Sequence, residues 1–170
     1  GSLPVALAAN WLAGAWDQNA FSTVSSPLGA ALEMACLDWL REIFGFPKGV
    51  GGAFVTGATM ANFTALAAAR HAVLARRGWD VEQDGLFGAP PITVLVGGEG
   101  HAAMLKAVRM LGLGEGRVRR LEVDDQGAIR ADALPVIDGP SILCLQAGNV
   151  NSGAFDPAAA LIPAAQQAGA

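Results

Sequence analysis

The chain has 170 residues, which is enough for one ordinary domain or for part of a larger one. Hydrophobic residues make up 52% and charged residues 15%, so the chain can build a buried core and intrinsic disorder is a poor interpretation. A formal charge of −4 argues against nucleic-acid binding, which needs clustered Lys and Arg. The one short basic run, at Arg117, Arg119 and Arg120, alternates beside a predicted strand and indicates a solvated face.

The first segment, GSLPVALAANWLAGAW, is apolar but has no basic region ahead of it, and Asn10 interrupts it. We therefore expect a helix rather than a signal peptide, and no stretch reaches the length of a membrane span. Cys36 and Cys144 show neither zinc-site spacing nor a disulfide framework. Both are expected to be small core residues, which fits a reducing, cytoplasmic setting.

Ser26-Pro27 is a helix start signal, since Ser favours the N-cap and Pro the first helical position. Apolar residues recur at helical spacing as far as Ile43, and Gly45 and Pro47 end that helix. The later elements are expected as strands over 53–56, 92–96, 117–123 and 142–146, helices over 59–77, 101–111, 132–136 and 157–168, and an exposed loop over 78–91. This alternation predicts an α/β layer with a largely parallel sheet.

The loop after the first predicted strand, Thr56-Gly57-Ala58-Thr59, is a candidate phosphate site. Small residues allow an anion to approach the free N–H groups of a helix start, where the helix dipole favours negative charge, and the Thr59 hydroxyl adds a donor. The plainer interpretation is a strand-to-helix turn with Thr59 as N-cap. The motif alone does not distinguish the phosphate site from the plain turn.

Two further loops carry unusual residues. Gly97-Gly98-Glu99-Gly100-His101 places a histidine at a helix start, where its flat ring can stack on an aromatic ligand or serve a structural role. Gln146–Pro157 is crowded with amides and hydroxyls, and its Gly148-Asn149 part is nearest the strand tip, whereas Asp156-Pro157 reads as a helix start. Ligands of open α/β sheets bind outside the carboxyl ends of the strands, so the three loops predict one site. His71, within a helix, is expected at the surface without a role.

Four segments occur in an order and spacing typical of one enzyme family: GGAFVTGATMANFTALAAAR, GGEGHAAMLKAVRMLG, VDDQGAIRADAL and QAGNVNSGAFDP. Together with SSPLGAALEMACLDWLREIFGFP, they make the chain resemble the group II pyridoxal-phosphate-dependent amino acid decarboxylases over nearly its whole length. The resemblance implies the fold type I large domain, a mainly parallel sheet with flanking helices that is incomplete here, working as a homodimer. It also implies pyridoxal 5'-phosphate as cofactor and an amino acid as substrate, with no metal, nucleic-acid or membrane partner.

By this resemblance Ala58 and Thr59 would contact the cofactor phosphate. His101 would stack on the cofactor ring, and Asn149 would lie close to the cofactor and the substrate. The family often has Thr where Asn149 stands, and Ser shortly after the stacking histidine, where this chain has Ala. These departures concern the details of substrate contact.

The largest departure from the family pattern lies after Ala170, which falls inside a helical pattern. The family's aspartate for the cofactor's ring nitrogen and its Schiff-base lysine would come later in the sequence. Lys48 and Lys106, the only lysines here, do not match the reactive lysine. We therefore expect a fragment that is inactive by itself.

The sequence thus predicts an N-terminal helical segment over 1–50 and a partial cofactor-binding large domain over 51–170. Two alternatives remain open at this level. One is another fold type I enzyme, such as an aminotransferase or a carbon–sulfur lyase. The other is a non-catalytic binding or interaction module.

Overall fold

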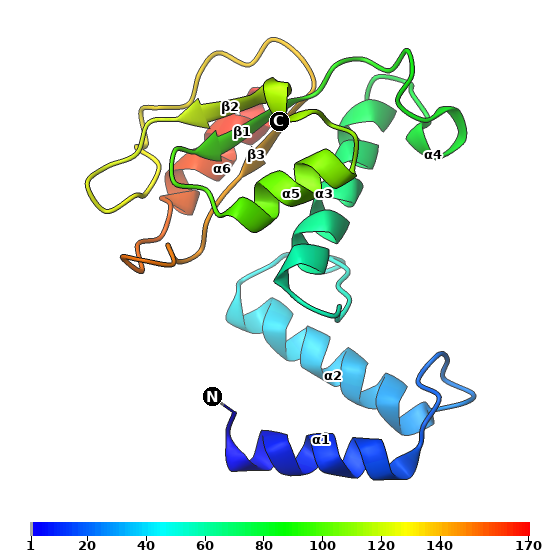
Figure 1. The fold of residues 1–170 in the computed structure, drawn as a ribbon. Helices are drawn as coiled ribbons and strands as arrows, with labels where there is room; N and C mark the ends of the chain where they lie inside the picture. The colour runs from blue at the N-terminus through cyan, green and yellow to red at the C-terminus, as the bar shows by residue number, and fades with distance from the viewer. Residues whose placement is uncertain (1) are drawn as a thin grey trace. The chain divides into compact units, whose positions relative to one another are not determined.

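The computed structural model describes residues 2–170, which form two compact units that meet in sequence between Phe54 and Val55 (Figure 1). The first unit contains helices α1, Pro4–Trp16, and α2, Pro27–Ile43, as the sequence predicts. Both begin with proline in the first turn, where the missing N–H costs no intrahelical bond. Neither helix has a buried side chain.

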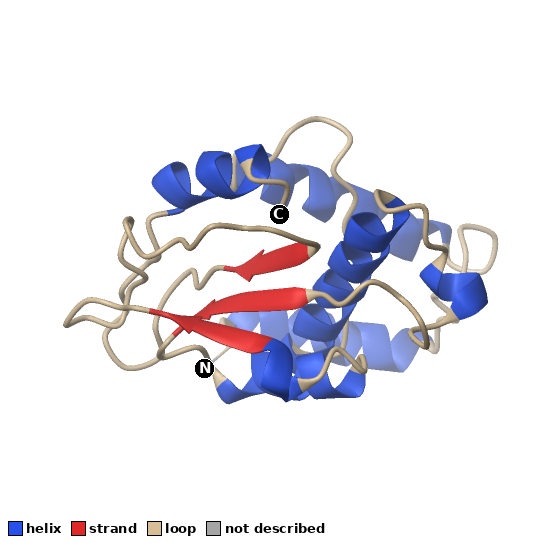
Figure 2. Ribbon diagram, turned by 90° about the horizontal axis from the view of Figure 1, so that it is seen from above, coloured by secondary structure: helices blue, strands red, loops and turns tan. Residues whose placement is uncertain are grey.

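The second unit alternates helices with strands. Its elements are α3 Ala58–Ala75, α4 Val81–Asp84, β1 Thr93–Gly97, α5 Ala102–Met110, the 3-10 turn η1 Glu115–Arg117, β2 Val118–Leu121, β3 Ser141–Cys144 and α6 Ala158–Gln167. The strands form a parallel sheet in the order β2-β1-β3 (Figure 2). In register, Val94 pairs with both Val118 and Ile142. The predicted parallel α/β layer is confirmed.

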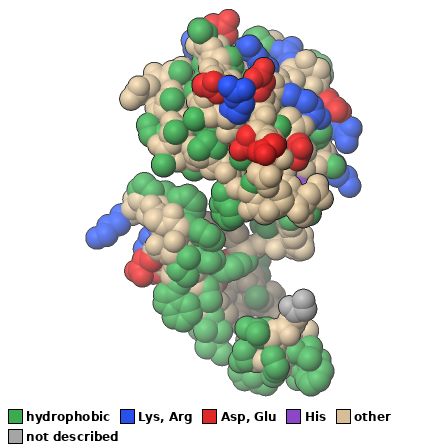
Figure 3. All heavy atoms as spheres, turned by 90° about the vertical axis from the view of Figure 1, so that its left-hand side faces the viewer, with side chains coloured by type: hydrophobic (Ala, Val, Ile, Leu, Met, Phe, Trp, Pro, Cys, Tyr) green, Lys and Arg blue, Asp and Glu red, His purple; other side chains and the backbone are tan. Residues whose placement is uncertain are grey.

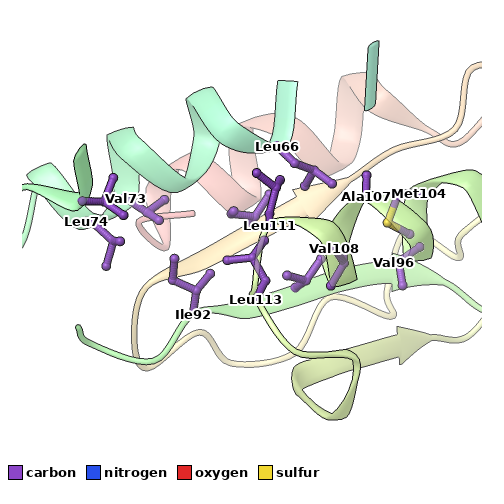
Figure 4. Packing of buried hydrophobic residues seen from close by; sticks show 13 residues of the cluster. Leu66, Val73, Leu74, Ile92, Val96, Met104, Ala107, Val108, Leu111 and Leu113 are labelled. Atoms are coloured by element: carbon purple, nitrogen blue, oxygen red, sulfur yellow. The ribbon is translucent and has the colours of Figure 1, made fainter. Parts of the chain in front are cut away.

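The central strand β1 is buried along nearly its whole length, and its side chains alternate between two apolar clusters. Val94 and Val96 belong to a cluster that also contains residues of α3 and α5, including Leu66, Leu74 and Val108. Figure 4 shows this cluster between the helices and the sheet. On the opposite face, Leu95 packs with β2, with Ile129 and with Leu161 of α6. Because β1 is covered on both faces, a continuous apolar run rather than an alternating one encodes it.

The predicted strand over 53–56 is wrong, because these residues have no regular structure. A strand exists only through hydrogen bonds to a neighbour, and none of the three strands within residues 2–170 pairs with this segment. Phe54 is also 55% exposed.

The predicted helix over 132–136 is also wrong, since the segment is a turn followed by irregular chain. Pro135 lacks an N–H and disfavours helix at the residue before it. Ala133 and Leu134 instead pack directly onto the cluster around Leu95. Apolar residues at helical spacing here form a loop that covers the sheet.

The loop expected over 78–91 contains the short helix α4, whose first residue Val81 is buried. Asp80 caps it, because its carboxylate accepts from the N–H groups of Glu82 and Gln83 at 3.1 Å each. The strand expected over 117–123 is shorter, since η1 precedes it and Val123 makes only an isolated bridge with Ile129. Within residues 2–170 no helix has both the length and the apolar character to cross a bilayer.

Candidate functional site

A cavity of about 680 Å³ lies in the second unit, at the carboxyl ends of β1 and β3. The start of α3 lines it with Ala58 and Asn62, and the start of α5 lines it with Gly100 and His101. Most of the remaining wall is apolar, with Leu66, Val96 and Met104 among its residues. The carboxyl edge of a parallel sheet is where α/β proteins bind ligands.

Helix α3 presents uncapped N–H groups at the edge of this cavity. It begins at Ala58 with Gly57 as N-cap, so the alternative that Thr59 is the N-cap is wrong. Glycine has no side-chain oxygen, and no side chain caps this helix start. The first-turn N–H groups are therefore available to an anion, with the helix dipole favouring its charge.

His101 is the N-cap of α5, one residue before the helix itself begins. Its Nδ1 accepts a hydrogen bond from the N–H of Ala103 at 3.1 Å. A neutral ring that accepts at Nδ1 carries its hydrogen on Nε2. The capping bond therefore fixes the ring at the cavity wall while the side chain stays exposed.

Asn149 is 5% exposed and is held by its own loop and by a loop far away in the sequence. Its Oδ1 accepts from the N–H groups of Asn151 and Ser152, at 2.8 and 3.3 Å. Its Nδ2 donates to Oε2 of Glu99 at 3.0 Å. The flanking residues Gly148 and Val150 line the cavity, but Asn149 is not among the lining residues.

Asp156 is a second buried polar side chain, 8% exposed, and it lines the cavity. Its Oδ1 accepts from the N–H of Ile129 at 2.8 Å, and its Oδ2 accepts from the N–H of Gln146 at 2.6 Å. The carboxylate thus fastens the end of the β3 loop to the segment after β2. The N-cap of α6 is Pro157, so the Asp156 side chain serves tertiary structure rather than the helix start.

The turn at Asp124–Gly127 closes over the Glu99–Asn149 pair. The Asp124 carboxylate accepts from the N–H groups of Gln126 and Ala128, and Gly127 has a φ of +80°. A Cβ at position 127 would clash with Glu99 and would lie 2.6 Å from Nδ2 of Asn149. Glycine is required here by both the backbone conformation and the close approach.

We expect Gly127→Ala to lower the free energy of unfolding by about 2 kcal/mol or more, because it combines a strained φ with a clash. Gly153→Ala is the matched control, since Gly153 has a φ of +78° but a methyl group added there would meet nothing within 4 Å among residues 2–170. That control should cost about 1 kcal/mol from the backbone alone. Urea unfolding of both variants measures the difference, and equal costs would contradict the close packing of the three loops.

Cys144 lines the same cavity near the end of β3. Burial raises the pKa of its thiol to about 11, so the thiol is neutral at physiological pH. It packs partly against the main apolar cluster, as expected of a small core residue, and a neutral thiol is a poor nucleophile. Cys36 is only half-buried on α2, a helix without buried side chains, so the expectation of a core residue is wrong for Cys36. Both cysteines are free.

The structure brings Ala58 and His101 together at one cavity, whereas Thr59 and Asn149 are not among its lining residues. His71 is exposed, as expected, and pairs with Glu82 at 2.7 Å.

Sequence reasoning did not single out Asn62, Glu99 or Asp156 as site residues. The sequence indicates Asp156 only as part of a helix start, together with Pro157. Residues 2–170 hold no cluster of three or more His, Cys, Asp or Glu that suits a metal ion.

Proteins of similar sequence match this chain over most of its length. Residues 2–169 match the pyridoxal-dependent decarboxylase conserved domain. The chain is 27% identical to an L-2,4-diaminobutyrate decarboxylase of Acinetobacter baumannii, over 88% of this chain and 31% of the relative. It is 28% identical to tryptophan decarboxylase 1 of Oryza sativa subsp. japonica, over 92% of this chain and 34% of the relative.

Solved structures agree with these relatives. Mouse CSAD in its apo form matches with a TM-score of 0.90 and 28% identity, covering 99% of this chain and 36% of that one. Oryza sativa TDC with PLP and tryptamine matches with a TM-score of 0.81 and 25% identity, covering 99% and 37%. The chain therefore spans about a third of the length of these proteins. A match along almost every residue, with the fold type I arrangement of these enzymes, shows that the chain belongs to the pyridoxal-dependent decarboxylase family.

Proposed function

We propose that this chain supplies the phosphate loop and the ring-stacking histidine of a pyridoxal-phosphate-dependent amino acid decarboxylase. The observation that carries the proposal is the meeting of two helix starts, at Ala58 and His101, on one cavity at the carboxyl edge of the sheet. The free N–H groups at the start of α3 suit a phosphate, and the ring of His101 suits stacking on a flat aromatic ring. The helical segment over 1–50 would lead into this partial large domain over 51–170.

The residues present fit the cofactor. A volume of about 680 Å³ lies within the usual range for small-molecule sites, and the wall is mainly apolar. Ala58 and Thr59 would contribute first-turn donors of α3 to the phosphate, while His101 would lie against the ring and Asn149 would border the cofactor and substrate region through its loop. Bound there, pyridoxal phosphate supplies an electron sink for the loss of carbon dioxide from an amino acid.

The helices of the first unit support a homodimer. Large apolar side chains on both are exposed, with Val5 at 73%, Trp11 at 68% and Met34 at 67%, and Figure 3 shows hydrophobic side chains gathered over them. Exposed apolar surface on this scale is typical of an association surface. A second copy of the chain is the partner we propose, in the cytoplasm, where the two free cysteines stay reduced. Sedimentation of the full-length protein tests the dimer.

Two substitutions of His101 test the proposed ring contact in the full-length protein. His101→Asn keeps an N-cap side chain but removes the aromatic ring, so cofactor affinity should fall about 10-fold while stability is retained. His101→Phe keeps a ring but removes the capping acceptor, so affinity should be largely retained while stability falls by about 1 kcal/mol. Cofactor titration followed by visible absorbance, together with thermal unfolding, measures both effects. Unchanged affinity in His101→Asn would contradict the ring contact.

A further inference from the structure

We propose that Asn149 and Glu99 form a positioning pair that fixes the loop carrying His101, so that Asn149 acts through Glu99 rather than by direct contact with a ligand. The inference rests on the proposed function only in assigning His101 to the cofactor ring. The geometry of the pair stands independently of that assignment.

Both polar atoms of the Asn149 side chain have hydrogen-bond partners within the protein. Its oxygen accepts from two backbone N–H groups of its own loop, and its nitrogen donates to the Glu99 carboxylate at 3.0 Å. Its backbone is also bonded, since its N–H donates to the carbonyl of Ala154 and its carbonyl accepts from the N–H of Gly153, each at 2.8 Å. Asn149 is also only 5% exposed, and its side-chain oxygen already has partners in its own loop.

Glu99 connects this engaged side chain to the histidine. It lies two residues before His101, in the loop between β1 and α5. Because Asn149 is buried and bonded into its own loop, its hydrogen bond to Glu99 ties the loop before α5 to a fixed point. Gly127 lies beside both members of the pair, so a Cβ added there would clash with each of them.

The same loop is restrained from two other sides. Nη1 of Arg120 donates to the carbonyl of Gly98 at 2.8 Å, and the Gly100 position has Val96 so close that a Cβ would lie 2.5 Å from its Cγ2. Gly98 and Glu99 are therefore bonded to residues of β2 and of the β3 loop, and Gly100 lies against Val96 of β1. Of these contacts, the Asn149–Glu99 bond is the one that joins the histidine loop to the loop after β3.

The pair can be tested by exchanging donor and acceptor. Glu99→Gln keeps an acceptor for Asn149 Nδ2 and should behave as wild type. Asn149→Asp keeps the acceptor for Asn151 and Ser152 but sets two carboxylates against each other. The double variant Asn149→Asp/Glu99→Gln restores a donor–acceptor pair in reverse and should recover the wild-type behaviour.

The readout is the amide exchange of Ala103, whose N–H is bonded to His101 Nδ1 and so reports the ring position directly. In the full-length protein without cofactor, Asn149→Asp should raise this exchange rate about 10-fold relative to the amides of β1. Glu99→Gln and the double variant should remain near the wild-type rate. Cofactor affinity, measured in parallel with pyridoxal phosphate, should follow the same order.

Unchanged Ala103 exchange in a folded Asn149→Asp protein would overturn the proposal. An equal increase at Ala103 and throughout β1, without recovery in the double variant, would also overturn it, because the pair would then serve only global stability. Failure of the wild-type protein to bind pyridoxal phosphate would instead count against the proposed function, and the Ala103 result would still decide the positioning role.

Discussion

Asp156→Ala should lower the free energy of unfolding by about 2–4 kcal/mol, because it leaves the buried N–H of Ile129 and the half-buried N–H of Gln146 without their acceptor. For a chain of this size that corresponds to a fall in melting temperature on the order of 10 °C. Asp156→Asn should cost less, since the amide keeps the volume and one acceptor. It still turns an NH2 group toward one of the two N–H donors.

Asp125→Asn is the matched control for Asp156, since it makes the same chemical change at an exposed side chain in the neighbouring turn. Surface substitutions of this kind stay within about 0.5 kcal/mol. Urea unfolding of the three variants should therefore rank wild type and Asp125→Asn together, then Asp156→Asn, then Asp156→Ala. If Asp156→Ala unfolded at the same urea concentration as Asp125→Asn, the Asp156 carboxylate would not hold the β3 loop to the segment after β2.

The helices and the buried strands could be predicted from the sequence because their signals are local. Pro27 after Ser26 marks the start of α2, and the β-branched apolar runs before Gly97 and Cys144 mark β1 and β3. The strand expected at 53–56 failed because a strand depends on a hydrogen-bonded neighbour, which a short apolar run does not specify. At 132–136 a short helix was expected, and Pro135 disfavours one there.

The site was predictable in outline but not in its connections. Three loops at the carboxyl ends of strands predicted one site, and Ala58 and His101 do line one cavity. However, the partners of Asn149 and Asp156 lie far away in the sequence, at Glu99 and Ile129. The sequence marked Asn149 as a site candidate and Asp156 only as part of a helix start, and the fold alone shows that both side chains bond to other loops.

The 170-residue chain by itself should release no carbon dioxide from an amino acid beyond the rate of free pyridoxal phosphate, because neither of its lysines lines the cavity that we propose for the cofactor. Lys106 is exposed on α5, and Lys48 belongs to the first unit. The reaction of this family requires a lysine that bonds the cofactor and an acid that keeps its ring protonated. Among the lining residues, Asp156 is the one carboxylate, and both of its oxygens already accept backbone hydrogen bonds.

The measurement is carbon dioxide release by the purified chain, with its mass verified, in the presence of pyridoxal phosphate and a mixture of aromatic, acidic and diamino acids. Circular dichroism and cofactor titration of the same sample show that it is folded and able to bind, so that inactivity is not the result of unfolding. The full-length protein, assayed beside it, should decarboxylate at least one of these amino acids. Turnover by the folded 170-residue chain above the free cofactor would mean that Lys48 or Lys106 replaces the family's reactive lysine. Lys48→Met and Lys106→Met would then identify which, because removal of the responsible amine abolishes the activity and leaves the fold intact.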